Sequence, residues 1–359
     1  MRELNTAPFF SLLLIREHTL LQERGERVKV LHLNRFFYSG QTTHAFSLVK
    51  EQQKQGLDAR LILDGNPSYQ ALELYRETIN ELGVTTVKPG DLQAVLQQLQ
   101  HWQPQVIHAH SPLTFPLAAL LAREYSAPLV ITCHGLGLNN QEMSPYLQQA
   151  SAIICISRRV ANSMHDFAAK VHLVPNGVDL QEFKPAPKSE PVKIAYVGRI
   201  DQSKLKGYNH FCKAVDLLEQ VEFFVAANKP PNSKTAHYLG WTSDVAGLLA
   251  KTDIVVGTGR AIIEGLACGN AAIILGRSCQ GILTPEKIKA KAIDLSGLVG
   301  NDPCYKNIFY DLAKLTQNKI YLQQLQKFGR ELAEKEFDNT KLTRKIIVIY
   351  EQILTLPIK

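Results

Sequence analysis

Two stretches of similar pattern, "RVKVLHLNRF" (residues 27–36) and "PVKIAYVGRI" (residues 191–200), decide the fold of this chain. Each is an apolar run that follows a basic residue and reaches an arginine, and each opens a series of strands that alternate with helical stretches. The first series continues through "ARLILD", "QVIHAH", "PLVITCHG", "SAIICIS" and "VHLVPNG", and the second through "VEFFVAA", "TDIVVGTG" and "NAAIILG". Alternating strands and helices build parallel sheets that are covered on both faces. The sequence therefore predicts an α/β protein with two Rossmann-like, doubly wound domains.

The polar stretch "DLQEFKPAPKSEP" (residues 179–191), with its three prolines, has the composition of a linker between these domains. A second break, "FDNT" (residues 337–340), interrupts the helical period near the end of the chain. We predict five segments: a helical extension without an assigned role over 1–26, an N-terminal domain over 27–180, a linker over 181–191, a C-terminal domain over 192–338, and a C-terminal helix over 339–359. We expect that helix to pack back on the N-terminal domain.

Composition indicates a soluble globular protein, because 45% of the 359 residues are hydrophobic and 20% are charged. The six cysteines lack the spacing of a zinc site or a disulfide framework, so we expect reduced thiols and a cytoplasmic protein. The apolar run from Phe9 to Ile15 is too short to span a bilayer. A net charge of +7 suits phosphates, nucleotides or an anionic membrane surface, although it also serves solubility. No pattern typical of a nucleic-acid module is present.

In the first half, the candidate residues lie where strands end, because ligands of parallel α/β sheets bind there. Gly40 precedes a helix, where a glycine lets backbone N–H groups approach an anion, although an ordinary turn would look the same. His108 and His110 lie two apart on a strand and point to one side. His110 and His134 end consecutive strands, which favours a polar site for a sugar hydroxyl. A metal is not expected, because no acid or third histidine lies near the His-x-His pair in the sequence.

In the second half, Arg199 and Lys206 follow the first strand in "YVGRIDQSKLKG" (residues 196–207). A guanidinium fork and an ammonium group together suit a diphosphate, and Lys204 competes with Lys206 for the second role. A solvated basic loop is the alternative.

The stretch "VVGTGRAIIEGLACG" (residues 255–269) supplies the clearest site signal. Gly257 and Gly259 remove side chains at a strand end, and the helix that begins near Arg260 points its first N–H groups outward, which predicts a phosphate site. The spacing is not the Gly-x-Gly-x-x-Gly of dinucleotide folds. Glu264, one turn further, could accept hydrogen bonds from a ribose diol, or it could form an ion pair with Arg260 at i, i+4.

In combination, these motifs resemble the retaining family-4 glycosyltransferases of GT-B architecture. The resemblance rests on "SGQTTHAFSLVKEQQKQG", "VIHAHSP", "ITCHGLG", "CISRRV", "VPNGVDLQEF", "VGRIDQSKLKG", "YLGWTSDVAGLLAKTDIVV" and "IIEGLACGNAAI". It implies these roles: Gly40 faces the donor phosphates, His110 contacts the transferred sugar, Arg199 and Lys206 stabilise the leaving diphosphate, Trp241 lines the base pocket, and Glu264 holds the ribose hydroxyls. It also implies an acceptor-side N-terminal domain and a C-terminal domain that binds the nucleotide sugar.

One position departs from the family pattern. The family usually has two glutamates separated by seven residues, and the first would fall at Val256, where "VGTGR" stands in place of "EGFGL". Arg260 adds a cation beside the expected diphosphate. We still expect an active enzyme, because Arg199, Lys206 and Glu264 are all present.

The resemblance predicts transfer of a sugar, with retention, from a nucleoside-diphosphate sugar to a sugar or lipid-linked glycan acceptor, in bacterial cell-surface polysaccharide or glycolipid synthesis. It implies no cofactor and no metal at the diphosphate, in line with the lack of an Asp-x-Asp motif. We expect a cytoplasmic location, with a peripheral contact at the inner face of the cytoplasmic membrane as an added hypothesis, and no nucleic-acid partner. Two alternatives stay open: a nucleotide-sugar epimerase of the same fold, and a catalytically silent relative that binds a nucleotide.

Overall fold

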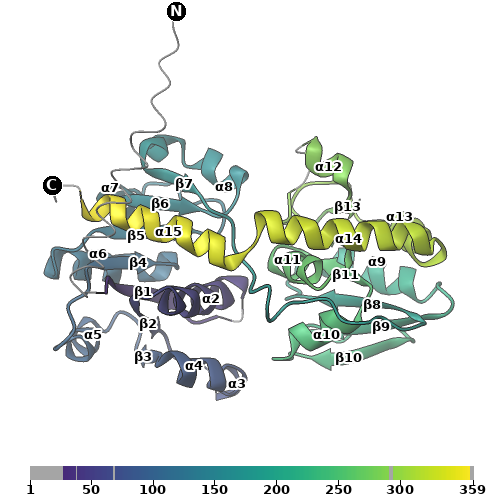
Figure 1. The fold of residues 1–359 in the computed structure, drawn as a ribbon, viewed down its shortest axis with the longest axis horizontal. Helices are drawn as coiled ribbons and strands as arrows, with labels where there is room; N and C mark the ends of the chain where they lie inside the picture. Colours follow the sequence, from purple (N-terminus) through teal and green to yellow (C-terminus); the bar gives the residue numbers. More distant parts are fainter. Residues whose placement is uncertain (1–26, 38, 68, 291–293, 356–359) are drawn as a thin grey trace, which may run out of the picture.

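The computed structural model describes residues 27–37, 39–67, 69–290 and 294–355, and these form two α/β domains (Figure 1). The predicted helical extension over 1–26 lies outside the described residues, as do the last four residues of the predicted C-terminal helix. None of the helices in the described ranges is long and apolar enough to cross a membrane.

The N-terminal domain is built on a seven-stranded parallel sheet in the order β3-β2-β1-β4-β5-β6-β7. Its strands are β1 (Lys29–Arg35), β2 (Asp58–Asp64), β3 (Thr85–Val87), β4 (Val106–Ala109), β5 (Leu129–Cys133), β6 (Ala152–Cys155) and β7 (Val171–Leu173). The α-helices between them are α2 (Gly40–Lys54), α3 (Tyr69–Leu74), α4 (Arg76–Leu82), α5 (Leu92–Gln98), α6 (Phe115–Glu124), α7 (Ser144–Gln149) and α8 (Arg158–Ser163). The central strands are buried on both faces, as the continuous apolar runs predicted.

The C-terminal domain has a six-stranded sheet in the order β10-β9-β8-β11-β12-β13. Its strands are β8 (Val192–Val197), β9 (Val221–Ala226), β10 (Ala236–Gly240), β11 (Ile254–Gly257), β12 (Ala271–Leu275) and β13 (Cys279–Ile282). Its helices are α9 (Leu205–Val215), α10 (Val245–Lys251), α11 (Arg260–Ala267), α12 (Pro285–Lys289), α13 (Tyr305–Gln317) and α14 (Lys319–Glu336). One strand departs from the predicted parallel arrangement: β13 runs antiparallel to β12, because the short connection between them makes a hairpin.

The last helix, α15 (Asn339–Leu354), leaves the C-terminal domain and lies along the N-terminal domain beside α2 (Figure 1). Its apolar face, with Leu342, Ile346 and Tyr350, joins the same core cluster as Val30 and Phe46. The chain therefore crosses between the domains twice, once before β8 and once between α14 and α15.

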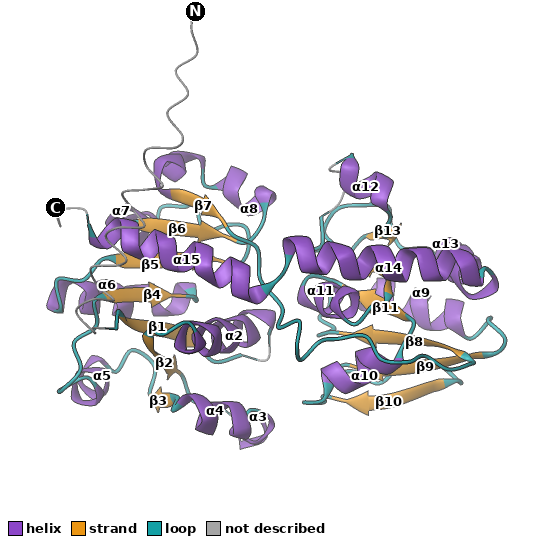
Figure 2. Ribbon diagram, in the orientation of Figure 1, coloured by secondary structure: helices purple, strands orange, loops and turns teal. Residues whose placement is uncertain are grey.

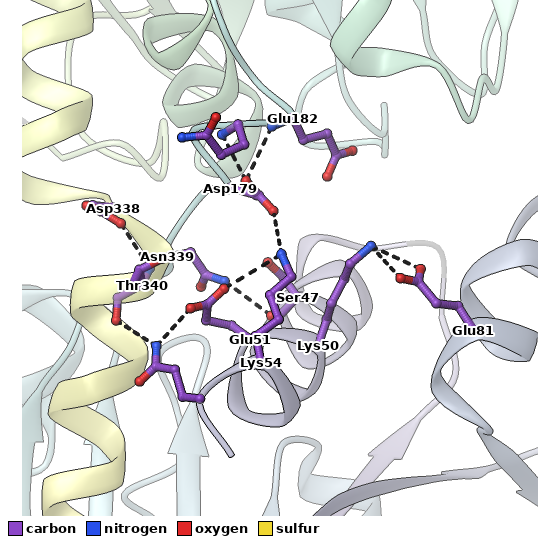
Figure 3. Close-up of polar contacts among 12 residues, drawn as sticks. Ser47, Lys50, Glu51, Lys54, Glu81, Asp179, Glu182, Asp338, Asn339 and Thr340 are labelled. Carbon is purple, nitrogen blue, oxygen red and sulfur yellow. Dashed lines mark hydrogen bonds and ion pairs between the residues drawn. The ribbon is translucent and has the colours of Figure 1, made fainter. Parts of the chain in front are cut away.

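The two crossings are hydrogen-bonded to each other. The Val178 amide donates to the Phe337 carbonyl at 2.8 Å, and the Asn339 amide donates to the Val178 carbonyl at 3.0 Å. Figure 3 shows the polar side chains around this junction, where Lys54 of α2 pairs with Asp179 at 3.3 Å. The side-chain amide of Asn339 also donates to the carbonyl of Ser47 at 3.2 Å.

The parallel strands of both sheets point toward the junction between the domains (Figure 2). An ion pair between the domains agrees with this direction of the strands. Arg159, which follows β6, pairs with Asp294 of the C-terminal domain at 3.0 Å. The carboxyl edges of the two sheets, where ligands of such folds bind, therefore face each other.

Candidate functional site

The C-terminal half of the site is the turn between β11 and α11. A Cβ atom on Gly257 would lie 2.6 Å from the Val197 carbonyl oxygen, so the close approach of β8 requires a glycine there. Gly259 has a φ of 57°, a left-handed conformation that favours glycine, and it caps α11 without a side chain. The first N–H groups of α11, from Arg260 on, therefore point out of the helix and can bind an anion.

Of the candidate cations, Lys204 is the one whose ammonium group reaches this turn. Its Nζ donates to the hydroxyl of Thr258 at 3.2 Å. Burial lowers the pKa of Lys204, and the nearby Arg199 acts in the same direction. Arg199 follows β8 and is exposed, so it is free to move onto a ligand.

Lys206 does not lie where the sequence analysis expected it. Its ammonium group pairs with Asp302, and its side chain is 57% exposed. The reason is geometric, because residues two apart at the start of a helix point to different sides. Lys204 faces the Gly-x-Gly turn, and Lys206 therefore faces away from it. Lys204 is thus the better placed of the two lysines to bind a diphosphate at this turn.

Glu264 forms the ion pair that the sequence analysis left as an alternative. The Nε of Arg260 lies 2.6 Å from Oε1 of Glu264, and both side chains are only 9% exposed. Burial raises the pKa of Glu264, while Arg260 opposes that shift. The Nη1 of Arg260 also donates to the Gly177 carbonyl at 3.1 Å, so the guanidinium joins the C-terminal domain to the crossing segment.

Val256, the expected position of the family's first glutamate, directly precedes the Gly-x-Gly turn. It lies inside β11, fully buried, and packs in the core cluster with Ile194, Ile254 and Ile273. A carboxylate at this position would therefore be buried in the core of the sheet. The strand continues to Gly257 and leaves two residues before α11, and the loss of the family's first glutamate at Val256 stays a prediction.

In the N-terminal half, His110 follows β4, and the structure places more histidines around it than the sequence analysis expected. His32 of β1, His44 of α2 and His134 after β5 have rings centred 5.3, 5.8 and 5.9 Å from that of His110. The statement that no third histidine accompanies the His-x-His pair holds along the sequence but not in space. The parallel order β1-β4-β5 brings these residues together.

A chain of hydrogen bonds leads from His110 to the C-terminal helix. His110 Nε2 lies 3.0 Å from His32 Nδ1, and His32 Nε2 lies 2.8 Å from Oε1 of Gln52. The amide of Gln52 donates to the Tyr350 hydroxyl at 3.1 Å, and that hydroxyl lies 2.5 Å from His108 Nδ1. Gln52 and Tyr350 were not predicted, and the only signal in the sequence was the polar Gln52 on an otherwise apolar face of α2.

The hydrogen bond to Gln52 decides which ring nitrogens along this chain of hydrogen bonds carry a proton. Because the Oε1 of Gln52 can only accept, Nε2 of His32 carries the proton and its Nδ1 accepts. His110 must then donate from Nε2, which leaves a lone pair on its Nδ1. This Nδ1 is buried and has no hydrogen-bond partner among the described residues.

The remaining predicted site residues lie at the same edges. Gly40 begins α2, with Ser39 as its cap, and a Cβ atom on Gly40 would lie 3.5 Å from the Cβ of Arg260. The first turns of α2 and α11 therefore face each other across the domain junction. Trp241 follows the edge strand β10 and is 40% exposed. A cavity of about 830 Å³ lies elsewhere, at the amino ends of the N-terminal strands beside Lys29 and Asp58.

Comparison with known proteins places this arrangement in a fold class. The structure of Anabaena Alr3699/HepE in complex with UDP-glucose superposes with a TM-score of 0.68 at 15% identity, covering 92% of this chain and 100% of that one. A glycosyltransferase from Rickettsia africae ESF-5 also gives 0.68, at 14% identity, with coverage of 92% and 100%. The chain has the GT-B fold, as predicted.

Sequence comparison adds a partial match. Residues 38–182 match the family described as Glycosyltransferase Family 4. Over 124 residues the chain is 25% identical to a glycogen synthase of Mycobacterium tuberculosis (strain ATCC 25618 / H37Rv). That match covers 29% of this chain and spans about 30% of the curated relative.

Proposed function

We propose that this chain is a family-4 glycosyltransferase that moves a sugar, with retention, from a nucleoside-diphosphate sugar to an acceptor hydroxyl. One observation carries the proposal: the anion seat formed by Gly257, Gly259 and Lys204 lies on the sheet edge that faces Gly40 and His110. The partial family match and the likeness to a UDP-glucose complex support it.

On the donor side, the N–H groups at the start of α11 hold the diphosphate, and Lys204 and Arg199 supply positive charge. This charge acts most strongly as the diphosphate leaves, because negative charge grows on it in the transition state. Protein cations thus stabilise the leaving diphosphate, which a metal ion stabilises in other transferases. Glu264 contacts the ribose with the carboxylate that also holds Arg260, and Trp241 lines the base pocket.

On the acceptor side, His110, which follows β4, contacts the transferred sugar. The acceptor is a sugar or lipid-linked glycan in cell-surface polysaccharide or glycolipid synthesis. The net charge of +7 suits work at the anionic inner face of the cytoplasmic membrane.

The test begins with a thermal-shift screen of UDP, GDP, ADP and their sugars, because a ligand that binds only the folded chain raises the midpoint. The donor that binds is then used in a transfer assay with Glu264→Gln, Lys204→Ala and the surface control Lys327→Ala. We expect the first two variants to lose most turnover while the control retains it. Parent rates in both site variants would show that the site is wrong.

Three further outcomes separate the proposal from its competitors. Inversion at the anomeric carbon of the product, followed by NMR, would overturn retention. A new nucleotide sugar formed from the donor alone would identify an epimerase. Nucleotide binding without turnover across the donor panel would identify a silent relative.

A further inference from the structure

Four buried imidazole nitrogens near the domain junction have no hydrogen-bond partner among the described residues. They are Nδ1 and Nε2 of His44, Nδ1 of His110 and Nε2 of His134. Buried polar atoms are normally satisfied, so a group of four such atoms calls for a ligand. One ligand atom from each of the three residues lies within 4.8 Å of the others.

The arrangement of the three rings matches that of imidazoles on one metal ion. Their centroids are 5.1, 5.8 and 5.9 Å apart. With metal–nitrogen bonds of about 2.0–2.1 Å at tetrahedral angles, ring centroids lie about 5 Å apart and ligand nitrogens about 3.4 Å apart. Side-chain rotations that bring the ligand nitrogens from within 4.8 Å of one another to about 3.4 Å would complete the set.

The neighbouring triplet, His32, His108 and His110, is also close enough to be considered. Both nitrogens of His32 and both of His108 are already engaged, with His110, Gln52, Tyr350 and Thr132. His32 and His108 therefore have no free lone pairs to offer, so this triplet is the outer layer of a site and not the site itself.

We propose that His44, His110 and His134 bind one divalent transition-metal ion, of the class of Zn²⁺, and leave a fourth position open. Imidazole ligands suit zinc, copper, iron and nickel, and three histidines with an open position are typical of sites that bind a water or a substrate oxygen. His110 has the support that metal-binding histidines usually have, because it donates its other N–H to His32.

The charge around the three residues agrees with this. Arg260 is a cation of the other domain that acts on His44, and its charge is balanced by Glu264 at 2.6 Å. This proposal departs from the sequence-based expectation of no metal.

The test uses the full chain with any affinity tag removed, stripped with a chelator and then dialysed. Zn²⁺ binding is measured by calorimetry, and Co²⁺ is titrated because its visible absorption reports tetrahedral coordination. We expect one equivalent of metal to bind. His44→Gln and His134→Gln should each weaken binding at least tenfold, and the double variant should abolish the Co²⁺ spectrum.

Two further variants refine the assignment. His165→Gln is the matched control, because its ring is 73% exposed on the same domain, and it should bind metal like the parent. His32→Gln, which alters the partner of His110, should weaken binding by about 10–100-fold. Circular dichroism of each variant shows whether it is folded.

The proposal is overturned if the stripped chain binds no stoichiometric Zn²⁺ or Co²⁺, or if the double variant binds as the parent does. Metal binding does not depend on the proposed transfer reaction, so the two can fail separately. Metal binding without transfer for any donor would refute the proposed glycosyl transfer but not the proposed metal site. Full transfer by protein that binds no metal would refute the site and leave the function.

Discussion

The ion pair between Arg260 and Glu264 gives the sharpest prediction, because both side chains are only 9% exposed. Arg260→Met removes the guanidinium while keeping much of its length and apolar volume. Glu264 is then left buried without its partner, and the Gly177 carbonyl loses a donor that lies at 3.1 Å. We expect a large loss of stability from a single substitution.

The size of the loss follows from the chemistry of the carboxyl group. A buried carboxylate without a partner can take up a proton, and at pH 7 this costs about 3.4 kcal/mol from the ordinary pKa of 4.5. That cost caps the penalty from Glu264. The lost hydrogen bond to Gly177 adds about 1 kcal/mol, so Arg260→Met should lower the free energy of unfolding by about 3–5 kcal/mol at pH 7.

The pH dependence has a definite sign. In Arg260→Met the folded state holds the proton on Glu264 more tightly than the unfolded chain does, so stability falls as pH rises from about 4.5 to 7. At pH 5 the proton costs only about 0.7 kcal/mol, and the penalty should shrink to about 1–2 kcal/mol.

Urea unfolding at pH 7 and pH 5 measures both effects, and a double-mutant cycle with Glu264→Met isolates the pair. The double variant buries two apolar side chains and should be more stable than the two single losses predict, by about 2–3 kcal/mol. A penalty below about 1 kcal/mol for Arg260→Met, an equal penalty at both pH values, or additive losses would refute this reasoning.

Three further predictions concern the anion seat, the crossing segments and the linker. Lys204→Met should weaken binding of the nucleotide identified by thermal shift by about 10–100-fold, the size of one charge-assisted hydrogen bond; calorimetry that shows the larger loss for Lys206→Met would contradict the geometry. Gly177→Ala should lower the free energy of unfolding in urea by about 1–3 kcal/mol, because the added Cβ would lie 2.6 Å from the Cα of Asn339. A variant as stable as the parent would show that the backbone near Gly177 can shift to accommodate the methyl group. Burial lowers the pKa of Lys188 to about 8, so the Lys188 ammonium group holds its proton more tightly in the unfolded chain than in the folded one. The wild-type protein should therefore gain about 2 kcal/mol relative to Lys188→Met between pH 7.5 and 9.5, and parallel pH profiles would exclude this.

The fold could be predicted from the sequence because its signals are local. Apolar runs that alternate with helical stretches identified ten of the thirteen strands that the structure describes, and the predicted strand run "NAAIILG" contains β12 (Ala271–Leu275). The edge strands β3, β10 and β13 were missed, because they are short and partly exposed and so lack a continuous apolar run.

The site was predictable only in part, because side-chain directions depend on the three-dimensional path. Lys204 and Lys206 are two residues apart, and only the start of α9 decides which one faces the Gly-x-Gly turn. Val256 was assigned by counting back from Glu264, but the strand buries it in the core. His110 and His134 were expected near each other because they end consecutive strands, whereas nothing along the sequence shows that His32 of β1 and His44 of α2 join them.

Arg260 accounts for several of these differences together. A carboxylate buried at Glu264 is costly by itself, and the guanidinium one turn earlier compensates for it. The same guanidinium is held by the Gly177 carbonyl, and Gly177 lies next to Val178, whose backbone bonds to both ends of the second crossing. Any ligand that draws Arg260 toward a phosphate at the start of α11 must therefore weaken its contacts with Glu264 and with the crossing segment. The site and the connection between the domains share one side chain, so they cannot change independently.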